Sequence, residues 1–365
     1  MSTVTIKNRT MYYEEYGSGF PIIFGHSYLW DNAMWQPQIA ALSTTYRCIV
    51  PDLWSHGCSD PPPSNPYSVE ELAEDMWTFA QALGLEQFAV VGLSVGGMWG
   101  AHLALDHPEA VSALVLLDTY LGSEPAETHV RYFGMLRIVE KTGIIPTPLQ
   151  DEIVPLFFSP ITIQQDPDMV SHFKANLSSF DAAQISGIVG MGQGIFSRTS
   201  QLERLHQITA PTMIIVGADD KSRPPHEAQK MAENIPGATL EVIPDAGHIS
   251  NLEQPKQVTQ LLEQFLNNTV GKNKNYEGIY MSHNTDKTSK RFTDQSGDWS
   301  EERATAEALR QKFLPAFSIW SAKNRAAPAS DHTLDEDDLC EGLDPAPTFA
   351  PARSQFMWVT ESYTL

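Results

Sequence analysis

A serine set between two glycines places the strongest limit on how this chain can fold. Residues 88–92 form an apolar run of strand length, and residues 95–105 then carry apolar side chains at helical spacing. Residues 92–96 read Gly-Leu-Ser-Val-Gly, which fits the G-x-S-x-G pattern of a nucleophile elbow. The glycines are needed because a Cβ at either position would crowd the neighbouring strand or helix. We therefore predict a strand, a strained one-residue corner that pushes the Ser94 hydroxyl outward, and a helix.

The pattern alone is weak, because glycine and serine are common residues. With each at about 7 % of an average sequence, a match arises by chance in about one chain in eight of this length. The alternative is an ordinary serine in a strand-to-helix turn. Residues elsewhere in the chain must therefore distinguish the two.

The rest of the chain alternates between short apolar runs and helical patterns. We expect strands at residues 4–6, 10–16, 21–24, 47–50, 88–92, 111–117, 212–216 and 239–243. We expect helices at residues 34–42, 69–83, 95–105, 224–235 and 252–266. Ser68 and Glu71 form a capping-box pattern at the start of the second of these helices. This alternation predicts an α/β fold, with a mostly parallel sheet and helices on both faces.

Two stretches depart from the alternation. Residues 122–208 contain helical patches and several prolines but no convincing strand, which indicates a helical cap insertion. After residue 270 the sequence is polar and aperiodic. We therefore divide the chain into core residues 1–121, a cap at 122–208, core residues 209–270, and a C-terminal extension at 271–365 that is expected to be largely disordered. The alternative for the extension is a docking segment that uses Phe313, Phe317, Ile319 and Trp320.

Composition argues against several functional classes. The formal charge of −21 disfavours nucleic acid and anionic membrane surfaces as partners, since both are negative themselves. No apolar run approaches a membrane span, and the N-terminus lacks a secretory core. The three cysteines are odd in number and lack metal-binding spacing, which favours a cytoplasmic location. No metal is expected and no cofactor either, because the glycines at 190, 192 and 194 follow no strand and no phosphate loop is present.

Chemically active side chains follow three of the expected parallel strands. Ser94 follows the fifth strand, Asp220 the seventh and His248 the eighth. Carboxyl ends of parallel strands share one edge of a sheet, so these side chains are expected to meet there. A serine hydroxyl needs a base such as histidine to take its proton, and a carboxylate must fix the tautomer of that base. Asp118, at the end of the sixth strand, is the alternative to Asp220 as the acid.

Other residues are expected to complete such a site. The backbone N–H groups of Tyr28 and Val95 are the expected oxyanion donors. His26 and His56 are expected to organise their loops rather than to act as second bases. Six aromatic residues are candidates for an apolar substrate pocket, with core packing as the alternative for each: Trp30, Trp35, Trp99, Tyr120, Phe157 and Phe158.

Over residues 1–270 the chain resembles the α/β-hydrolase superfamily. The resemblance rests on five motifs in order: the histidine–glycine loop at 25–28, the aspartate loop at 51–60, the elbow at 92–97, the acid loop at 217–224 and the histidine loop at 247–255. It implies the α/β-hydrolase fold, with an eight-stranded sheet and a helical cap after the sixth strand. Two positions depart from the pattern, since Ser27 and Ser55 stand where the family commonly has glycine.

The resemblance implies a hydrolase that cleaves small carboxylic esters or lactones through an acyl-enzyme on Ser94. Within the family, the sequence looks most similar to the group of small esterases and enol-lactonases. The expected partner is therefore a small apolar ester or lactone substrate. Alternatives on the same triad are cofactor-free perhydrolase or haloperoxidase activity and hydrolysis of carbon–carbon bonds. The alternative of another class is a ligand-binding protein on a hydrolase fold.

Overall fold

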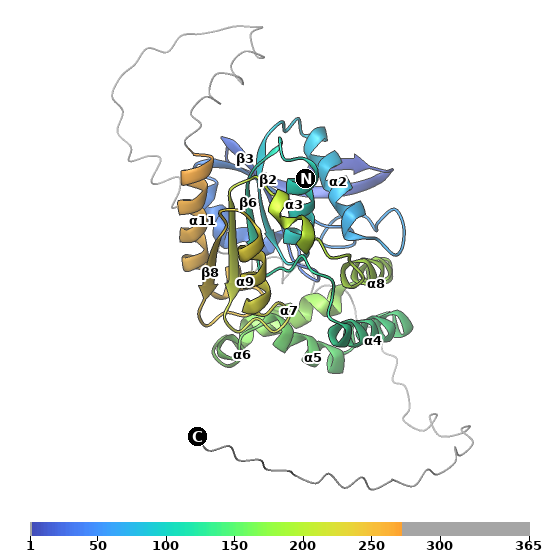
Figure 1. The fold of residues 1–365 in the computed structure, drawn as a ribbon. Helices are drawn as coiled ribbons and strands as arrows, with labels where there is room; N and C mark the ends of the chain where they lie inside the picture. The colour runs from blue at the N-terminus through green and yellow to red at the C-terminus, as the bar shows by residue number, and fades with distance from the viewer. Residues whose placement is uncertain (1, 272–365) are drawn as a thin grey trace, which may run out of the picture. The chain divides into compact units, whose positions relative to one another are not determined.

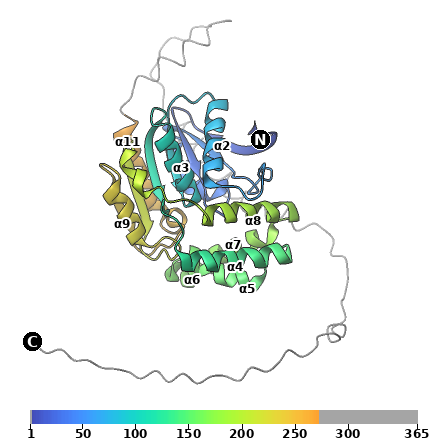
Figure 2. The ribbon, with the colours of Figure 1, turned by 45° about the vertical axis from the view of Figure 1, so that its right-hand side comes forward.

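A computed structural model of the chain describes residues 2–271 (Figures 1 and 2). Met1 and residues 272–365 lie outside the described part. The C-terminal extension predicted at 271–365, with its alternative as a docking segment, therefore lies outside it except for Gly271.

Eight strands form one sheet in the order β1-β2-β4-β3-β5-β6-β7-β8. β1 pairs with β2 and β2 with β4 in antiparallel fashion, and the other neighbours are parallel. The mostly parallel eight-stranded sheet expected from the sequence is thus confirmed. The strands are β1 (Ser2–Ile6), β2 (Arg9–Tyr16), β3 (Phe20–Gly25), β4 (Tyr46–Pro51), β5 (Phe88–Leu93), β6 (Val111–Leu117), β7 (Thr212–Gly217) and β8 (Thr239–Ile243).

Helices cover both faces of the sheet. On one face α2 (Val69–Ala82) packs against α3 (Val95–Asp106), α3 lies on the central strands, and α9 (Pro225–Asn234) lies on β7 and β8. On the other face α1 (Gln36–Leu42) packs against α11 (Pro255–Thr269), with the short helix η1 (Asn32–Trp35) beside them. The predicted capping box begins α2, since Ser68 Oγ accepts from Glu71 N at 3.1 Å. Within residues 2–271, no helix is both long and apolar enough to cross a bilayer.

Five helices lie between β6 and β7, where the sequence analysis expects the helical insertion. They gather together beyond the sheet (Figures 1 and 2), and we call them the cap. The short helix η2 (Leu202–Gln207) then leads back to β7. The division of the chain into core and cap remains our interpretation. The cap helices are α4 (Ala126–Thr142), α5 (Thr147–Phe157), α6 (Pro160–Gln165), α7 (Pro167–Ser179) and α8 (Ala182–Phe196).

The helix expected at residues 252–266 is two helices in the structure. α10 (Ser250–Glu253) ends at Gln254, and α11 begins at Pro255. Proline has no N–H to donate to a preceding turn, so it starts a helix more readily than it continues one. The apolar periodicity runs through both helices, which is why the pattern alone did not show the break.

α8 packs closely against the loop that precedes α2. A Cβ on Gly194 would lie 1.7 Å from the Tyr67 backbone oxygen, and a Cβ on Gly190 would lie 1.9 Å from Asn65 Oδ1. The Tyr67 N–H also donates to the Gly190 oxygen at 3.2 Å. The glycines of α8 therefore serve close packing between the cap and the core.

Gly194→Ala is expected to lower the free energy of unfolding by about 2 kcal/mol or more, because the new Cβ would collide with backbone atoms. Gly134→Ala in α4 is the matched control, since its Cβ would meet nothing nearer than Arg137 Nη2 at 4.0 Å. The control should gain up to about 1 kcal/mol, because alanine suits a helix interior better than glycine. Equilibrium urea unfolding measures both variants. Equal effects of the two substitutions would contradict the close packing at Gly194.

Candidate active site

Ser94 stands at the corner between β5 and α3. Its backbone adopts φ 55° and ψ −119°, which L-residues rarely do. Hydrogen bonds to β6 and the loop after it hold this corner: Ser94 N donates to the Leu117 oxygen at 2.9 Å, and the Ser94 oxygen accepts from Thr119 Oγ1 at 2.7 Å. The serine is therefore held in a strained turn at the carboxyl edge of the sheet.

Two glycines allow the corner to fit against its neighbours. A Cβ on Gly92 would lie 2.2 Å from the Gly96 oxygen, and a Cβ on Gly96 would lie 2.2 Å from the Gly25 oxygen. The end of β3, the end of β5 and the start of α3 thus approach one another with only backbone between them. This is the crowding by strand and helix that the motif predicts.

His248 and Asp220 meet at the same edge. His248 Nδ1 lies 2.8 Å from Asp220 Oδ2, and both residues are buried. The other carboxylate oxygen accepts from the backbone N–H groups of Ser222 and Arg223, each at 2.8 Å. A carboxylate in this position accepts from Nδ1–H, so Nε2 is the nitrogen of His248 that can take up a proton.

Ser94 and His248 line one cavity. In the described residues the Ser94 hydroxyl makes no hydrogen bond, either to His248 or to another protein group. Such bonds are often long before substrate binds and shorten in the reactive complex. The structure therefore brings the three predicted residues to one place, and proton transfer among them remains a proposal.

Asp118, the alternative acid, serves as an anchor between two loops. Its carboxylate accepts from Gly217 N at 2.8 Å and from Ser250 Oγ at 2.6 Å. Burial, and then the negative charge of Asp220, raise the pKa of Asp118 well above its ordinary value. Its bonds join the end of β7 to the start of α10, whereas Asp220 is the carboxylate bonded to His248.

The backbone N–H groups of Tyr28 and Val95 are the predicted oxyanion donors. Val95 is the first residue of α3, where an N–H has no acceptor within the helix. Tyr28 follows the end of β3 and lines the cavity with Ser94. Across residues 2–271, neither N–H donates to a protein acceptor. Both groups thus keep their hydrogen-bonding capacity, as oxyanion donors require.

Two buried histidines hold the loops around Tyr28. His26 Nε2 accepts from Leu53 N at 2.8 Å, and His56 Nε2 accepts from Leu29 N at 3.1 Å. In both rings Nδ1 faces a backbone oxygen, so both are neutral with the proton on Nδ1. Burial lowers the pKa of His26 to about 3 and that of His56 to about 4. They organise loops, as their positions in the sequence suggested.

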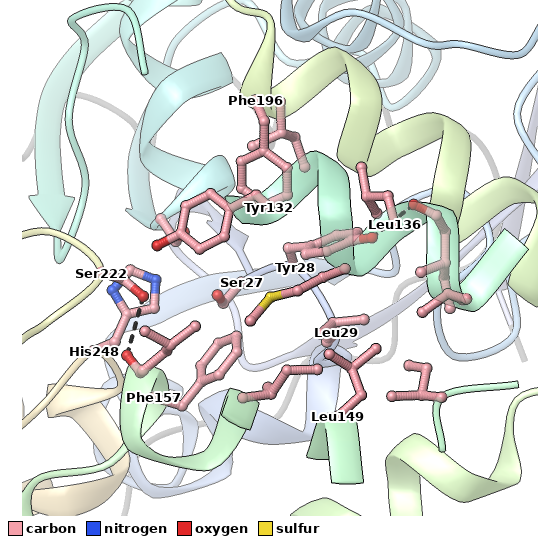
Figure 3. Close-up of a pocket in the computed structure, with 18 of the residues that line it drawn as sticks. Ser27, Tyr28, Leu29, Tyr132, Leu136, Leu149, Phe157, Phe196, Ser222 and His248 are labelled. Atoms are coloured by element: carbon pink, nitrogen blue, oxygen red, sulfur yellow. Dashed lines mark hydrogen bonds between the residues drawn. The ribbon is translucent and has the colours of Figure 1, made fainter. Parts of the chain in front are cut away.

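The cavity lies between the carboxyl edge of the sheet and the cap (Figure 3). Its volume is about 90 Å³. Seven residues with polar side chains line it: Ser27, Tyr28, Ser94, Tyr132, Ser222, Arg223 and His248. The remaining lining residues are apolar and come mainly from α4, α5 and α8: Leu29, Met98, Met135, Leu136, Val139, Ile145, Leu149, Ile153, Leu156, Phe157, Ile188, Ile195 and Phe196.

Of the six aromatic candidates for the pocket, Phe157 lines the cavity, whereas Trp30, Trp99 and Tyr120 lie elsewhere, which corrects the expectation for these three. The Trp30 ring stacks on Phe173 with centroids 4.8 Å apart, and Trp99 packs tightly against Gly25. Tyr120 packs over Gly122. None of the three is among the residues that line the cavity. The lining residues 132, 135, 136 and 139 have helical spacing. This spacing can be seen in the sequence, but it predicts a buried helix face without showing whether that face lines a pocket or packs in the core.

Arg223 brings a cation to the cavity wall, and buried carboxylates balance it. Glu124 Oε2 lies 2.5 Å from Arg223 Nη2 and 2.8 Å from Arg198 Nη1, and Glu227 Oε2 lies 3.6 Å from Arg223 Nη1. Although burial opposes ionisation, the two arginines lower the pKa of Glu124. The cluster therefore adds no net positive charge to the cavity. Over the part of the chain that the structure describes, no three His, Cys, Asp or Glu side chains are grouped to hold a metal ion.

The cap is bonded directly to the histidine loop. The His248 N–H donates to the Phe157 oxygen of α5 at 2.8 Å. The Glu253 carboxylate accepts from Gly247 N at 2.7 Å and from Ser159 N at 2.8 Å, so it bridges the two segments. The cap thus both lines the cavity and fixes the backbone of His248.

Comparisons with known proteins agree with this architecture. A family model described as alpha/beta hydrolase fold matches residues 21–138 and 162–255, which is more than half of the 365 residues. The chain is 29% identical over 269 residues to 3-oxoadipate enol-lactonase 2 of Acinetobacter baylyi, covering 72% of this chain and 94% of that protein.

Two solved structures are similar over most of their length. A thermophilic esterase of Thermogutta terrifontis is 28% identical, with a TM-score of 0.68 over 73% of this chain and 99% of that chain. The enol-lactonase of Burkholderia xenovorans LB400 is 25% identical, with a TM-score of 0.66 over 73% of this chain and 99% of that chain.

The buried neutral histidines predict a loss of stability in mild acid. An unfolded histidine binds a proton near pH 6.5, whereas folded His56 does so only near pH 4. Between these values the unfolded state holds more protons, so stability is present above about pH 6.5 and is lost as the pH falls towards 4. His56→Gln should make the fall shallower by up to about 1.4 kcal/mol per pH unit.

The measurement is the free energy of urea unfolding between about pH 7 and pH 5. His206→Gln, at an exposed position, is the control and should keep the wild-type slope. A His56→Gln slope equal to that of the control would show that His56 does not titrate as a buried neutral group.

Proposed function

This chain belongs to the alpha/beta hydrolase fold family, and we propose that it is a serine hydrolase of small carboxylic esters or lactones. The observation that carries the proposal is the 2.8 Å contact between His248 Nδ1 and Asp220 Oδ2, with His248 and Ser94 in the wall of one cavity. The relatives, which include an esterase and enol-lactonases, support hydrolytic chemistry on this fold.

The proposed reaction has two halves. In the first, Ser94 Oγ attacks the substrate carbonyl carbon while His248 Nε2 takes the hydroxyl proton, and Asp220 stabilises the imidazolium. The oxyanion accepts from the N–H groups of Tyr28 and Val95. His248 then returns the proton to the leaving alcohol, which leaves an acyl-enzyme. In the second half, water attacks the acyl carbon while His248 takes its proton. The bond from Ser94 Oγ to the acyl carbon then breaks, His248 returns the proton to Oγ, and the carboxylic acid is released.

An uncharged, apolar substrate suits the cavity best. Most of its lining is aliphatic or aromatic, which favours transfer of apolar surface out of water. Arg223 is the cation in the lining, and Glu124 already neutralises it.

The odd number of cysteines supports a reducing, cytoplasmic location as part of the same proposal.

Replacing the nucleophile tests the proposal directly. Ser94→Ala should lower kcat/KM for p-nitrophenyl acetate by at least about 10⁴-fold, because no acyl-enzyme can form. A fluorophosphonate probe should label wild-type protein at Ser94, as located by mass spectrometry. Ser123→Ala, at an exposed serine, is the control and should keep both activity and labelling. Turnover that survives Ser94→Ala would refute the proposal.

The acid is tested separately. Asp220→Asn should lower kcat by about 10⁴-fold, since an amide cannot hold the imidazole in the tautomer that accepts the serine proton. Asp219→Asn is the matched control in the same loop, because Asp219 is not bonded to His248, and it should retain wild-type kcat. Steady-state hydrolysis of p-nitrophenyl acetate gives both values. If Asp220→Asn keeps kcat within about tenfold of the wild type, another carboxylate must serve as the acid.

A further inference from the structure

The cavity wall contains a buried hydroxyl that the proposed mechanism does not use. Ser27 is fully buried, and within residues 2–271 its Oγ has no hydrogen-bond partner. Buried polar atoms are paired in the great majority of cases, so an unpaired one at a reactive cavity calls for an explanation.

The backbone N–H and the backbone oxygen of Ser27 both make hydrogen bonds. Its N–H donates to Met34 Sδ at 3.4 Å, and its oxygen accepts from Trp30 N at 3.1 Å and from His26 Nδ1 at 2.8 Å. The backbone of Ser27 is therefore fixed on both sides. Its hydroxyl is the polar group of this residue that has no assigned partner, and it can turn about the Cβ–Oγ bond.

The location of this hydroxyl suggests what it binds. Ser27 immediately precedes Tyr28, whose backbone N–H is a proposed oxyanion donor, and both line the cavity with Ser94 and His248. Figure 3 shows Ser27 among the residues around this space. Only a few covalent bonds separate the Ser27 hydroxyl from the Tyr28 N–H.

We propose that the Ser27 hydroxyl is a third donor to the oxyanion, and this inference rests on the proposed hydrolase function. As Ser94 attacks, the carbonyl π electrons move to the oxygen, and the hydroxyl donates a hydrogen bond to the negative charge that develops. The proton stays on Ser27 Oγ, so no bond to it is broken. A donor held in a dry site on a fixed backbone stabilises the transition state more than the ground state.

Ser55 provides a matched control. It is equally buried, its Oγ is likewise without a partner within residues 2–271, and it is not among the residues that line the cavity. Neither Ser27→Ala nor Ser55→Ala removes a protein hydrogen bond, so both should unfold at or above the wild-type temperature. Only Ser27→Ala should slow turnover.

The first measurement is steady-state hydrolysis of p-nitrophenyl acetate. Ser27→Ala should lower kcat by about 10- to 100-fold with little change in KM, whereas Ser55→Ala should match the wild type. A drop that appears in KM alone would mean that the hydroxyl binds the ground state and would overturn the inference. Equal kcat values for the two variants would overturn it as well.

The second measurement uses a short-chain alkyl trifluoromethyl ketone, whose adduct with Ser94 carries an oxyanion. Ser27→Ala should weaken its inhibition by the same factor by which kcat/KM falls. Inhibition that stays at the wild-type level would contradict donation to the oxyanion.

Labelling by the fluorophosphonate probe distinguishes a failure of the proposed role of Ser27 from a failure of the proposed hydrolase function. If wild-type protein is labelled at Ser94 and active, but Ser27→Ala behaves as Ser55→Ala does, only the role of Ser27 is refuted. If the probe does not label wild-type protein, the proposed function fails, and the role of Ser27 fails with it.

Discussion

The site depends on the contact of three backbone segments at the carboxyl edge of the sheet. β3 ends at Gly25, β5 passes through Gly92, and α3 places Gly96 between them, with no room for a Cβ on Gly92 or Gly96. Both proposed oxyanion donors come from segments that meet at this contact, since Tyr28 follows Gly25 and Val95 precedes Gly96. Any side chain at the contact would separate the two N–H groups. The close approach is therefore as much a requirement of the proposed chemistry as of the fold.

The loops at this edge are held by His26, His56 and Asp118, whose hydrogen bonds are to groups other than His248. His26 and His56 are neutral, each with an N–H donating to a ring nitrogen, so they act as fixed acceptors within the fold. Asp118 is bonded to backbone and hydroxyl donors on two other loops. His248 differs from the other two histidines because a carboxylate faces its Nδ1. Three histidines at one edge of the sheet thus have distinct tasks, which follow from what each ring nitrogen contacts.

Much of this arrangement could be predicted from the sequence, because local patterns determine it. The apolar runs gave the strands, the G-x-S-x-G spacing gave the corner at Ser94, and the strand ends gave the meeting of Asp220 with His248. The cavity wall could not be predicted in the same way. Apolar residues at helical spacing in α4 serve a core and a pocket equally well, and only the packing of the cap decides between them. The expectation for Trp30 failed for this reason, since its ring stacks on Phe173 rather than facing the cavity.

The cap is hydrogen-bonded to the core loops that carry His248 and Tyr28, so it cannot act as an independent cover. Its α5 accepts the N–H of His248, and its α8 accepts the hydroxyl of Tyr28 at the Ile188 oxygen, at 2.7 Å. Glu253 adds a third link between the histidine loop and the start of α6. A displacement of either helix would therefore have to break a bond to a residue of the proposed triad or oxyanion loop. Substitutions that shift α5 or α8 should for this reason alter the rate of the chemical step as well as substrate affinity, even where they touch no substrate.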